Sequence, residues 1–334
     1  MKTAGKLAPS RRRKTSINFL DGEARQKARR EAGYLVRLFD SKGRYPKARL
    51  AHRDALYWAD DDLVFMVTWS EPWDKFGDLP YTEMDWATAQ ELKLLASILL
   101  CELADGPPMR FYPVHGFAMW IDATSLNLAS PSVARSIKQS LTLRTLRPDM
   151  AAGEGAILRC LDGGYDLRQK KQFDLLRHQE IWSLISTDDH LLLRGVAALI
   201  KAEMLTAHPE FWEEAIVIAF IALEASFQMV LRELRKNQRD QPTAADAAKW
   251  IHRTFNEPFG HREVERYFED IYDQRIMTLH PASRFGVCPY APLAHDDYTL
   301  LRRDLPPIFA YLVTGTHSVE HLSNVERLGH VSRQ

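Results

Sequence analysis

Residues 210–236 read EFWEEAIVIAFIALEASFQMVLRELRK, and this stretch decides the fold of the half of the chain that contains it. Its apolar residues recur at helical spacing, and Pro209 stands just before its acidic start, so it predicts one long helix. The uninterrupted apolar run covers only residues 215–223, far fewer than the roughly 18 residues that a membrane span needs. We therefore expect a core helix of a soluble protein with no membrane partner.

Helical spacing continues on both sides of this stretch. Further helices are predicted over residues 173–185, 188–205, 244–255, 261–279 and 296–315. The last of these contains Pro306 and Pro307, which predict either a kink or two shorter helices. Residues 171–334 are therefore predicted to form an α-helical bundle.

The chain before about residue 170 has a different pattern. Aromatic and β-branched stretches predict strands at residues 55–58, 63–69, 110–114 and 117–128. Between them, residues 88–103 show helical spacing, and Thr88 with Glu91 forms a capping-box pattern. Residues 162–164 read Asp-Gly-Gly, which is a turn signal. Residues 17–170 are thus predicted to form a mixed α/β domain for sensing or substrate positioning, and the whole chain is assigned to the α+β class.

The charges are balanced overall but not along the chain. There are 44 Lys and Arg against 44 Asp and Glu, yet residues 1–50 hold 15 basic and 4 acidic residues. Residues 1–16 are expected to be a flexible basic arm that contacts nucleic-acid phosphates or serves as a solubilising tail. The N-terminus lacks the apolar stretch of a signal peptide, and Cys101, Cys160 and Cys288 are too scattered for a disulfide framework. These features predict a cytoplasmic protein with free thiols.

Two charged residues fall on helix faces that are otherwise apolar. On the helix predicted from residue 261, Arg275 lies on the stripe formed by positions 264, 268, 271, 272 and 279. Glu224 shares a face of the 210–236 helix with Phe220 and Phe227. An unpaired buried charge costs several kcal/mol, so each residue needs a partner. We expect Glu224 and Arg275 to pair across two packed helices, which would fix the direction of the guanidinium.

His280 follows Arg275 by five residues and precedes Pro281. Proline disfavours helical geometry at the residue before it, so the helix is expected to end at His280 and let the imidazole turn toward Arg275. The helix dipole favours imidazolium there while the guanidinium opposes it, so His280 is expected to titrate near neutral pH. A histidine can transfer the proton of a ribose 2′-hydroxyl, and an arginine can hold the phosphate. The pair therefore predicts phosphodiester cleavage without a metal or any other cofactor.

At these residues the sequence resembles the HEPN superfamily, helical-bundle proteins whose signature is an arginine, four to six residues and a histidine near the end of a late helix. Here the signature reads RIMTLH over residues 275–280, preceded by YFEDIYDQ over residues 267–274. Residues 219–225, AFIALEA, resemble the family's earlier helix with its acidic residue, here Glu224. Residues 297–313 resemble its last helix, so the resemblance covers about residues 175–320.

The resemblance implies a metal-independent endoribonuclease in a homodimer, with Arg275 and His280 of both subunits forming one composite cleft. Glu224 would support the arginine. Many such proteins are toxins or anti-phage effectors, so the implied partners are RNA and an antitoxin or a phage trigger protein. Arg284 and His295 lie close to the cleft in sequence and are candidate substrate-binding residues.

Two other readings stay open for the helical half. Ile276 is apolar where active members of the family carry a polar residue, and Pro281 stands where a small residue is common. These two residues favour a non-catalytic HEPN module that binds nucleotide, RNA or a partner protein. The other alternative is a coincidental ion pair in an unrelated bundle.

The remaining signals are assigned structural roles. Residues 317–321 read HSVEH, the zinc pattern of the inverted metalloproteases, but only 13 residues follow for a third ligand, so a solvated helix end is expected. No other cluster has metal-ligand spacing, and no metal site is predicted. The aromatic residues of the N-terminal half are expected to be core. They are Tyr57, Trp58, Trp69, Trp73, Phe111, Tyr112 and Trp120.

Overall fold

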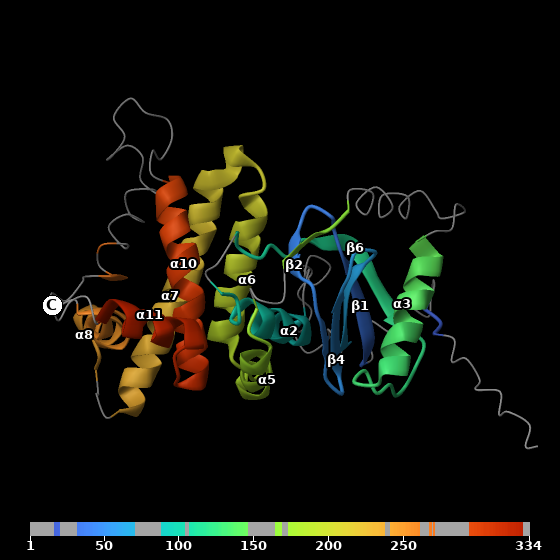
Figure 1. The fold of residues 1–334 in the computed structure, drawn as a ribbon, viewed down its shortest axis with the longest axis horizontal. Coiled ribbons are helices and arrows are strands. Elements are labelled where there is room, and N and C mark those ends of the chain that lie inside the picture. The colour runs from blue at the N-terminus through green and yellow to red at the C-terminus, as the bar shows by residue number, and fades with distance from the viewer. Residues whose placement is uncertain are drawn as a thin grey trace, which may run out of the picture.

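The computed structural model describes residues 17–20, 32–70, 88–103, 107–145, 164–168, 173–237, 241–260, 267–268, 270 and 294–329. Within these residues an antiparallel sheet with helices forms the N-terminal half, and the C-terminal half is helical (Figure 1). The protein is therefore of the α+β class, as the sequence predicts. The predicted basic arm lies outside the described residues, and the domain boundary near residue 170 stays a prediction.

Five antiparallel strands form the main sheet, in the order β3-β4-β5-β1-β6. Their bounds are β1 Gly33–Phe39, β3 Arg49–Ala51, β4 Ala55–Ala59, β5 Val64–Ser70 and β6 Pro113–Ile121. The strands predicted at residues 55–58 and 63–69 are confirmed as β4 and β5. Of the strand predicted at residues 117–128, only the part up to Ile121 is confirmed, because β6 ends there.

The strand predicted at residues 110–114 is wrong in its start. Arg110 exchanges backbone hydrogen bonds with Arg44 and does not belong to β6, which begins at Pro113. Arg44 opens β2 (Arg44–Pro46), which pairs in parallel with β7 (Asp166–Arg168) in a second, two-stranded sheet. Arg44 and Arg110 therefore lie outside the five-stranded sheet, on the side where the N-terminal half meets the helical half.

Different helices cover the two faces of the main sheet. The α3 helix (Pro131–Thr145) packs on one face through Ala134, Ile137 and Leu141, which are fully buried. The α2 helix (Ala89–Leu99) lies on the other face, between the sheet and the helical half (Figure 1). Tyr57, Phe111 and Trp120 are buried, so the core role predicted for these aromatic residues is confirmed.

The start of α2 is fixed by the predicted capping box. The Thr88 hydroxyl accepts a hydrogen bond from the Glu91 amide at 3.2 Å, and the Glu91 carboxylate accepts one from the Thr88 amide at 2.6 Å. The same carboxylate accepts bonds from Arg37 of β1, at 2.8 Å from Nε and 3.1 Å from Nη2. Both side chains of this ion pair are buried, so the helix start is tied to the sheet. The helix ends at Leu99, earlier than predicted.

Six helices of the helical half are described. They are α5 (Leu175–Leu184), α6 (His190–Leu205), α7 (Trp212–Lys236), α8 (Ala244–Ile251), α10 (Ala294–Thr314) and α11 (Val319–Gly329). The long α7 confirms the helix predicted at residues 210–236, and it packs against both α6 and α10 (Figure 1). The α10 helix runs without a break through Pro306 and Pro307, so the division into two shorter helices is wrong, while a kink stays a prediction. Fully buried Leu305 and Phe309 hold that part of the helix against its neighbours.

The α7 helix is the only described helix that is long and apolar enough to cross a membrane by length and composition, counted from Pro209 to Lys236. Its most apolar window is 61% buried inside the protein. This burial is typical of a core helix of a soluble protein.

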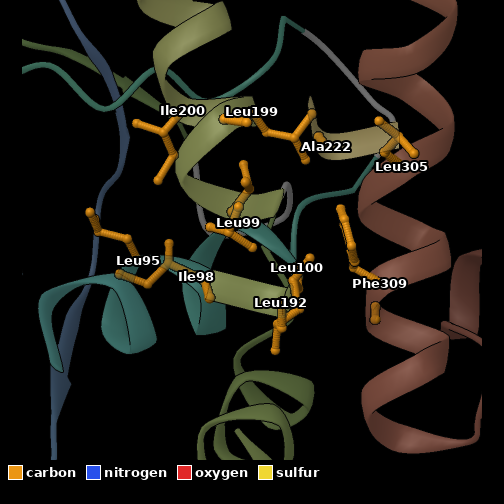
Figure 2. Close-up of a cluster of buried hydrophobic side chains, with 14 of the residues drawn as sticks. Leu95, Ile98, Leu99, Leu100, Leu192, Leu199, Ile200, Ala222, Leu305 and Phe309 are labelled. Atoms are coloured by element: carbon orange, nitrogen blue, oxygen red, sulfur yellow. The ribbon is translucent and has the colours of Figure 1, made fainter. Parts of the chain in front are cut away.

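One hydrophobic core joins the two halves. Figure 2 shows Leu95 and Leu99 of α2 below Ile200 and Leu199 of α6, with Leu305 and Phe309 of α10 at the far side of the cluster. These side chains are at most 2% exposed. The α2 helix therefore connects the sheet to the bundle through continuous apolar packing. Cys101, just after α2, is a buried free thiol, as predicted.

Candidate functional site

The central pair of the predicted site lies outside the described residues. This holds for Arg275 and His280, and also for Arg284. Of the predicted helix at residues 261–279, the structure describes residues 267, 268 and 270, all of them helical. The other two predicted site residues, Glu224 and His295, are described.

Glu224 lies on α7 and is half-buried. Its Oε1 accepts a hydrogen bond from Gln228 Nε2 at 2.9 Å, one helical turn later. Phe220, on the same face, is buried, and Phe227 is half-buried. The expected environment of Glu224 on an apolar face is confirmed, whereas its pairing with Arg275 stays a prediction.

Phe268 packs onto the same part of α7. Its ring centroid lies 5.0 Å from that of Phe227, with the two planes at 59°. Phe268 is 2% exposed, which confirms its predicted place on a buried stripe. The neighbouring Tyr267 is also enclosed: burial raises the pKa of its hydroxyl, which has no hydrogen-bond partner. Phe268, seven residues before Arg275 in the sequence, is therefore anchored on the helix that carries Glu224.

His295 stands at the start of α10 and is exposed. Its Nδ1 lies 3.1 Å from an Asp296 carboxylate oxygen. Its ring centroid lies 4.3 Å from that of Trp212, the first residue of α7. Trp212 also lines a large cavity, so His295 lies beside the rim of that cavity.

The cavity has a volume of about 490 Å³ and lies where the N-terminal half meets the bundle. Its wall is built by the segment after α2, the start of β2, and residues of α5, α6, α10 and α11. Five arginines and three glutamates belong to this wall. Pro306 and Pro307 also line the cavity. Because proline has no N–H group, it cannot donate a helical hydrogen bond to the carbonyl four residues earlier.

One end of the cavity is a network of buried charges. Arg302 of α10 donates from Nη2 to Glu102 at 2.6 Å, and its Nε lies 3.3 Å from Glu203 of α6. Tyr298 donates to Glu203 at 2.6 Å, and Arg110 donates to it at 3.3 Å. Burial by itself would lower the pKa of Arg302, but Glu102 and Glu203 raise it above its ordinary value. These arginines have their counter-charges within the protein, so the network is a structural connection between α6, α10 and the N-terminal half.

The other end contains Arg177 of α5 and two histidines. The rings of His317 and His321 stack with their centroids 4.0 Å apart and their planes at 11°. Burial, with smaller effects of His321 and Arg177, lowers the pKa of His317 to about 4. Burial also lowers the pKa of His321, so both rings are neutral at pH 7. Both side chains are half-buried and Val319 between them is 73% exposed, so the solvated helix end expected at residues 317–321 is confirmed in part.

Sequence reasoning missed Arg177, although a signal was present. Phe173, Arg177, Ile181 and Ile185 follow one another at four-residue spacing, and all four are buried. The arginine therefore interrupts an apolar stripe, which is the same argument that singled out Arg275. Among the described residues, no group of three or more His, Cys, Asp or Glu is arranged to hold a metal ion.

Comparisons with protein-family models, with curated proteins and with solved structures find no match. The HEPN resemblance therefore rests on the residues of the sequence alone.

Proposed function

We propose that the helical half is a metal-independent endoribonuclease of the HEPN type, which cleaves RNA at a composite Arg275 and His280 site in a homodimer. The observation that carries the proposal is the contact between Phe268 and Phe227. It holds Phe268, which precedes Arg275 by seven residues, against the helix of Glu224, as the proposed pairing of this carboxylate with Arg275 requires.

The chemistry follows from the three side chains. Neutral His280 accepts the proton of a ribose 2′-hydroxyl, and the 2′-oxygen attacks the neighbouring phosphorus. Arg275 holds the phosphate and stabilises the charge that develops on its oxygens. The bond from phosphorus to the 5′-oxygen breaks, and that oxygen takes up a proton. The products are a 2′,3′-cyclic phosphate and a 5′-hydroxyl, and Glu224 acts by holding the guanidinium in place.

The cellular role belongs to the same proposal. An RNA-cleaving bundle joined to a second, mixed α/β half suits a cytoplasmic toxin or anti-phage effector whose activity an antitoxin or a phage trigger protein controls. The exposed His295 and the basic residues of the arm, residues 1–16, would contact the RNA through its phosphates.

The first experiment is RNA cleavage by the purified full chain in excess EDTA. The expected result is cutting of single-stranded RNA with 2′,3′-cyclic phosphate ends, because no step requires a metal. Cutting that stops with EDTA and returns with a divalent cation would reject the mechanism.

A non-catalytic module is the second candidate, and Ile276 is the observation that favours it. A module of this kind would bind RNA as a dimer without cleaving it. In that case His280→Ala would leave every measured property of the protein close to that of the parent.

A further inference from the structure

Arg177 is a buried arginine that has no ion-pair partner among the described residues. Its side chain lies on the wall of the cavity, and the residue is 9% exposed. Nη2 donates to the carbonyl of Thr316 at 2.8 Å, and Nε is buried with no hydrogen-bond partner. Among the residues that the structure describes, no carboxylate forms an ion pair with it. Leaving a buried charge uncompensated is strongly unfavourable, so the site is incomplete without an anion.

The surroundings of Arg177 suit an anion with several oxygens. His317 and His321 lie at this end of the cavity, and neither ring carries a charge at pH 7. The Nε2 atom of His321 is buried and has no hydrogen-bond partner. A phosphate has more oxygens to share between a guanidinium and an imidazole than a carboxylate has.

Aromatic and apolar side chains form the adjoining wall. Phe255 lines the cavity, and its ring centroid lies 5.2 Å from that of His317. Pro306, Pro307 and Ala310 continue the wall along α10. A volume of about 490 Å³ is within the range of cavities that enclose a drug-sized molecule. The wall therefore offers a positive point at one end and a flat apolar surface beside it.

The other arginines of the cavity wall are less suited to bind a ligand anion. Arg302 and Arg110 are already paired with Glu102 and Glu203. A ligand anion there would compete with buried carboxylates. The other two arginines of the wall, Arg44 and Arg303, pair with Asp166 and Asp304. Arg177 is therefore the residue that selects the ligand.

We propose that this cavity binds a small organic phosphate of nucleotide size, with the phosphate on Arg177 and a flat ring on the apolar wall beside Phe255. The proposal does not depend on ribonuclease activity. Because residues of both halves line the cavity, a ligand bound there would affect the contact between the two halves.

The test is a titration of the full chain with AMP, followed by thermal unfolding and by calorimetry. Inorganic phosphate, adenosine and benzoate serve as probes for the phosphate alone, the uncharged ring and a carboxylate. The variants are Arg177→Met and Arg177→Gln. The matched control is Arg135→Met, which removes an exposed arginine of α3 on the opposite face of the sheet.

AMP is expected to raise the melting temperature of the parent and of Arg135→Met, with phosphate weaker and adenosine and benzoate close to inactive. Both Arg177 variants should lose at least tenfold in AMP affinity. Their melting temperatures without ligand should equal or exceed that of the parent, because an uncompensated buried charge is removed. No effect of AMP on the parent, or an equal effect on the Arg177 variants, would overturn the proposal.

Discussion

Phe227 and Phe268 meet with their ring centroids 5.0 Å apart, although 41 residues separate them along the chain. Phe227 is three positions after Glu224, and Phe268 is seven positions before Arg275. The contact therefore connects the helix of the predicted acid with Phe268, in the segment that is predicted to continue as a helix to the arginine. Loss of this contact is expected to affect both the stability and the chemistry of the bundle.

Phe268→Ala is expected to lower the free energy of unfolding by about 3 kcal/mol, because it removes a buried aromatic ring from the core. RNA cleavage should fall with it, since the segment that carries Arg275 would lose its anchor. Urea unfolding and a cleavage assay at 25 °C measure the two effects. Leu143→Ala, at a residue that is 58% exposed, is the control and should change stability by less than about 0.5 kcal/mol. Full activity in a destabilised Phe268→Ala would argue against the anchoring role.

The buried ion pair of Arg37 and Glu91 makes a second prediction. Glu91→Ala is expected to destabilise the protein by about 3–5 kcal/mol, because it leaves the Arg37 charge buried and removes the cap of α2. Adding Arg37→Met should recover part of the loss, since the uncompensated charge is then absent. Lys47→Ala, in an exposed pair with Asp61, should cost at most about 1 kcal/mol. A double variant less stable than Glu91→Ala would contradict this account.

The N-terminal half shows what the sequence can predict and what it cannot. The capping box of Thr88 and Glu91 was predictable because its two residues are three positions apart and their chemistry is local. Arg37, the partner that makes Glu91 a buried ion pair, is 54 positions away, and no local pattern connects the two. The α3 helix was missed because only a narrow stripe of it is apolar.

The helical half shows the same division. Periodicity predicted the long helices, because each of them buries one continuous face. The sequence left open whether α10 is one helix or two, since packing against distant helices outweighs the local effect of Pro306 and Pro307. The cavity was not predicted either, because its wall combines residues from positions 44 to 321. Within it, the four-residue spacing around Arg177 and the HSVEH pattern of residues 317–321 were readable from the sequence.

His52 and His178 predict that acid weakens the contact between the sheet and α5. Their Nε2 atoms lie 3.1 Å apart, and Nδ1 of His178 lies 3.2 Å from the Ser97 carbonyl, to which it donates. Nε2 of His178 must therefore accept a hydrogen bond from His52, and both rings are neutral. Burial lowers the pKa of His52 from 6.5 to about 4, with His178 and Lys93 lowering it and Asp54 opposing them. Burial also lowers the pKa of His178.

These lowered pKa values make the stability of the protein depend on pH. Between about pH 6.5 and pH 4, the unfolded chain binds protons that the folded chain does not, so stability should fall as the pH falls through this window. His52→Gln keeps a donor for His178 and removes one titrating group, so its stability should fall less steeply. Part of the pH dependence of stability should remain in this variant, because the pKa values of His317 and His321 are also lowered. Urea unfolding at pH 7.5, 6 and 5 measures it, with His190→Gln as an exposed control. A slope equal in all three proteins would contradict the role of the pair.

Glu224 makes a prediction that separates its proposed ion pair from its visible hydrogen bond. Glu224→Ala is expected to cost about 2–3 kcal/mol, because Arg275 would lose its counter-charge within a packed bundle. Gln228→Ala removes only the hydrogen bond between the two side chains and should cost about 1 kcal/mol or less. Thermal unfolding of both variants beside His280→Ala tests the difference. Equal melting temperatures for Glu224→Ala and the parent would show that the ion pair does not exist.

The most direct test of the central claim is the rate of RNA cleavage by His280→Ala in excess EDTA, measured beside the parent and Arg275→Ala. The account predicts that His280→Ala stays dimeric and binds RNA but cleaves it at least about 10²-fold more slowly, because the proton-transfer group is absent. Arg275→Ala should lose both binding and cleavage. A parent protein that binds RNA without cutting it, or a His280→Ala variant that cuts at the parent rate, would contradict the claim that this bundle is a ribonuclease.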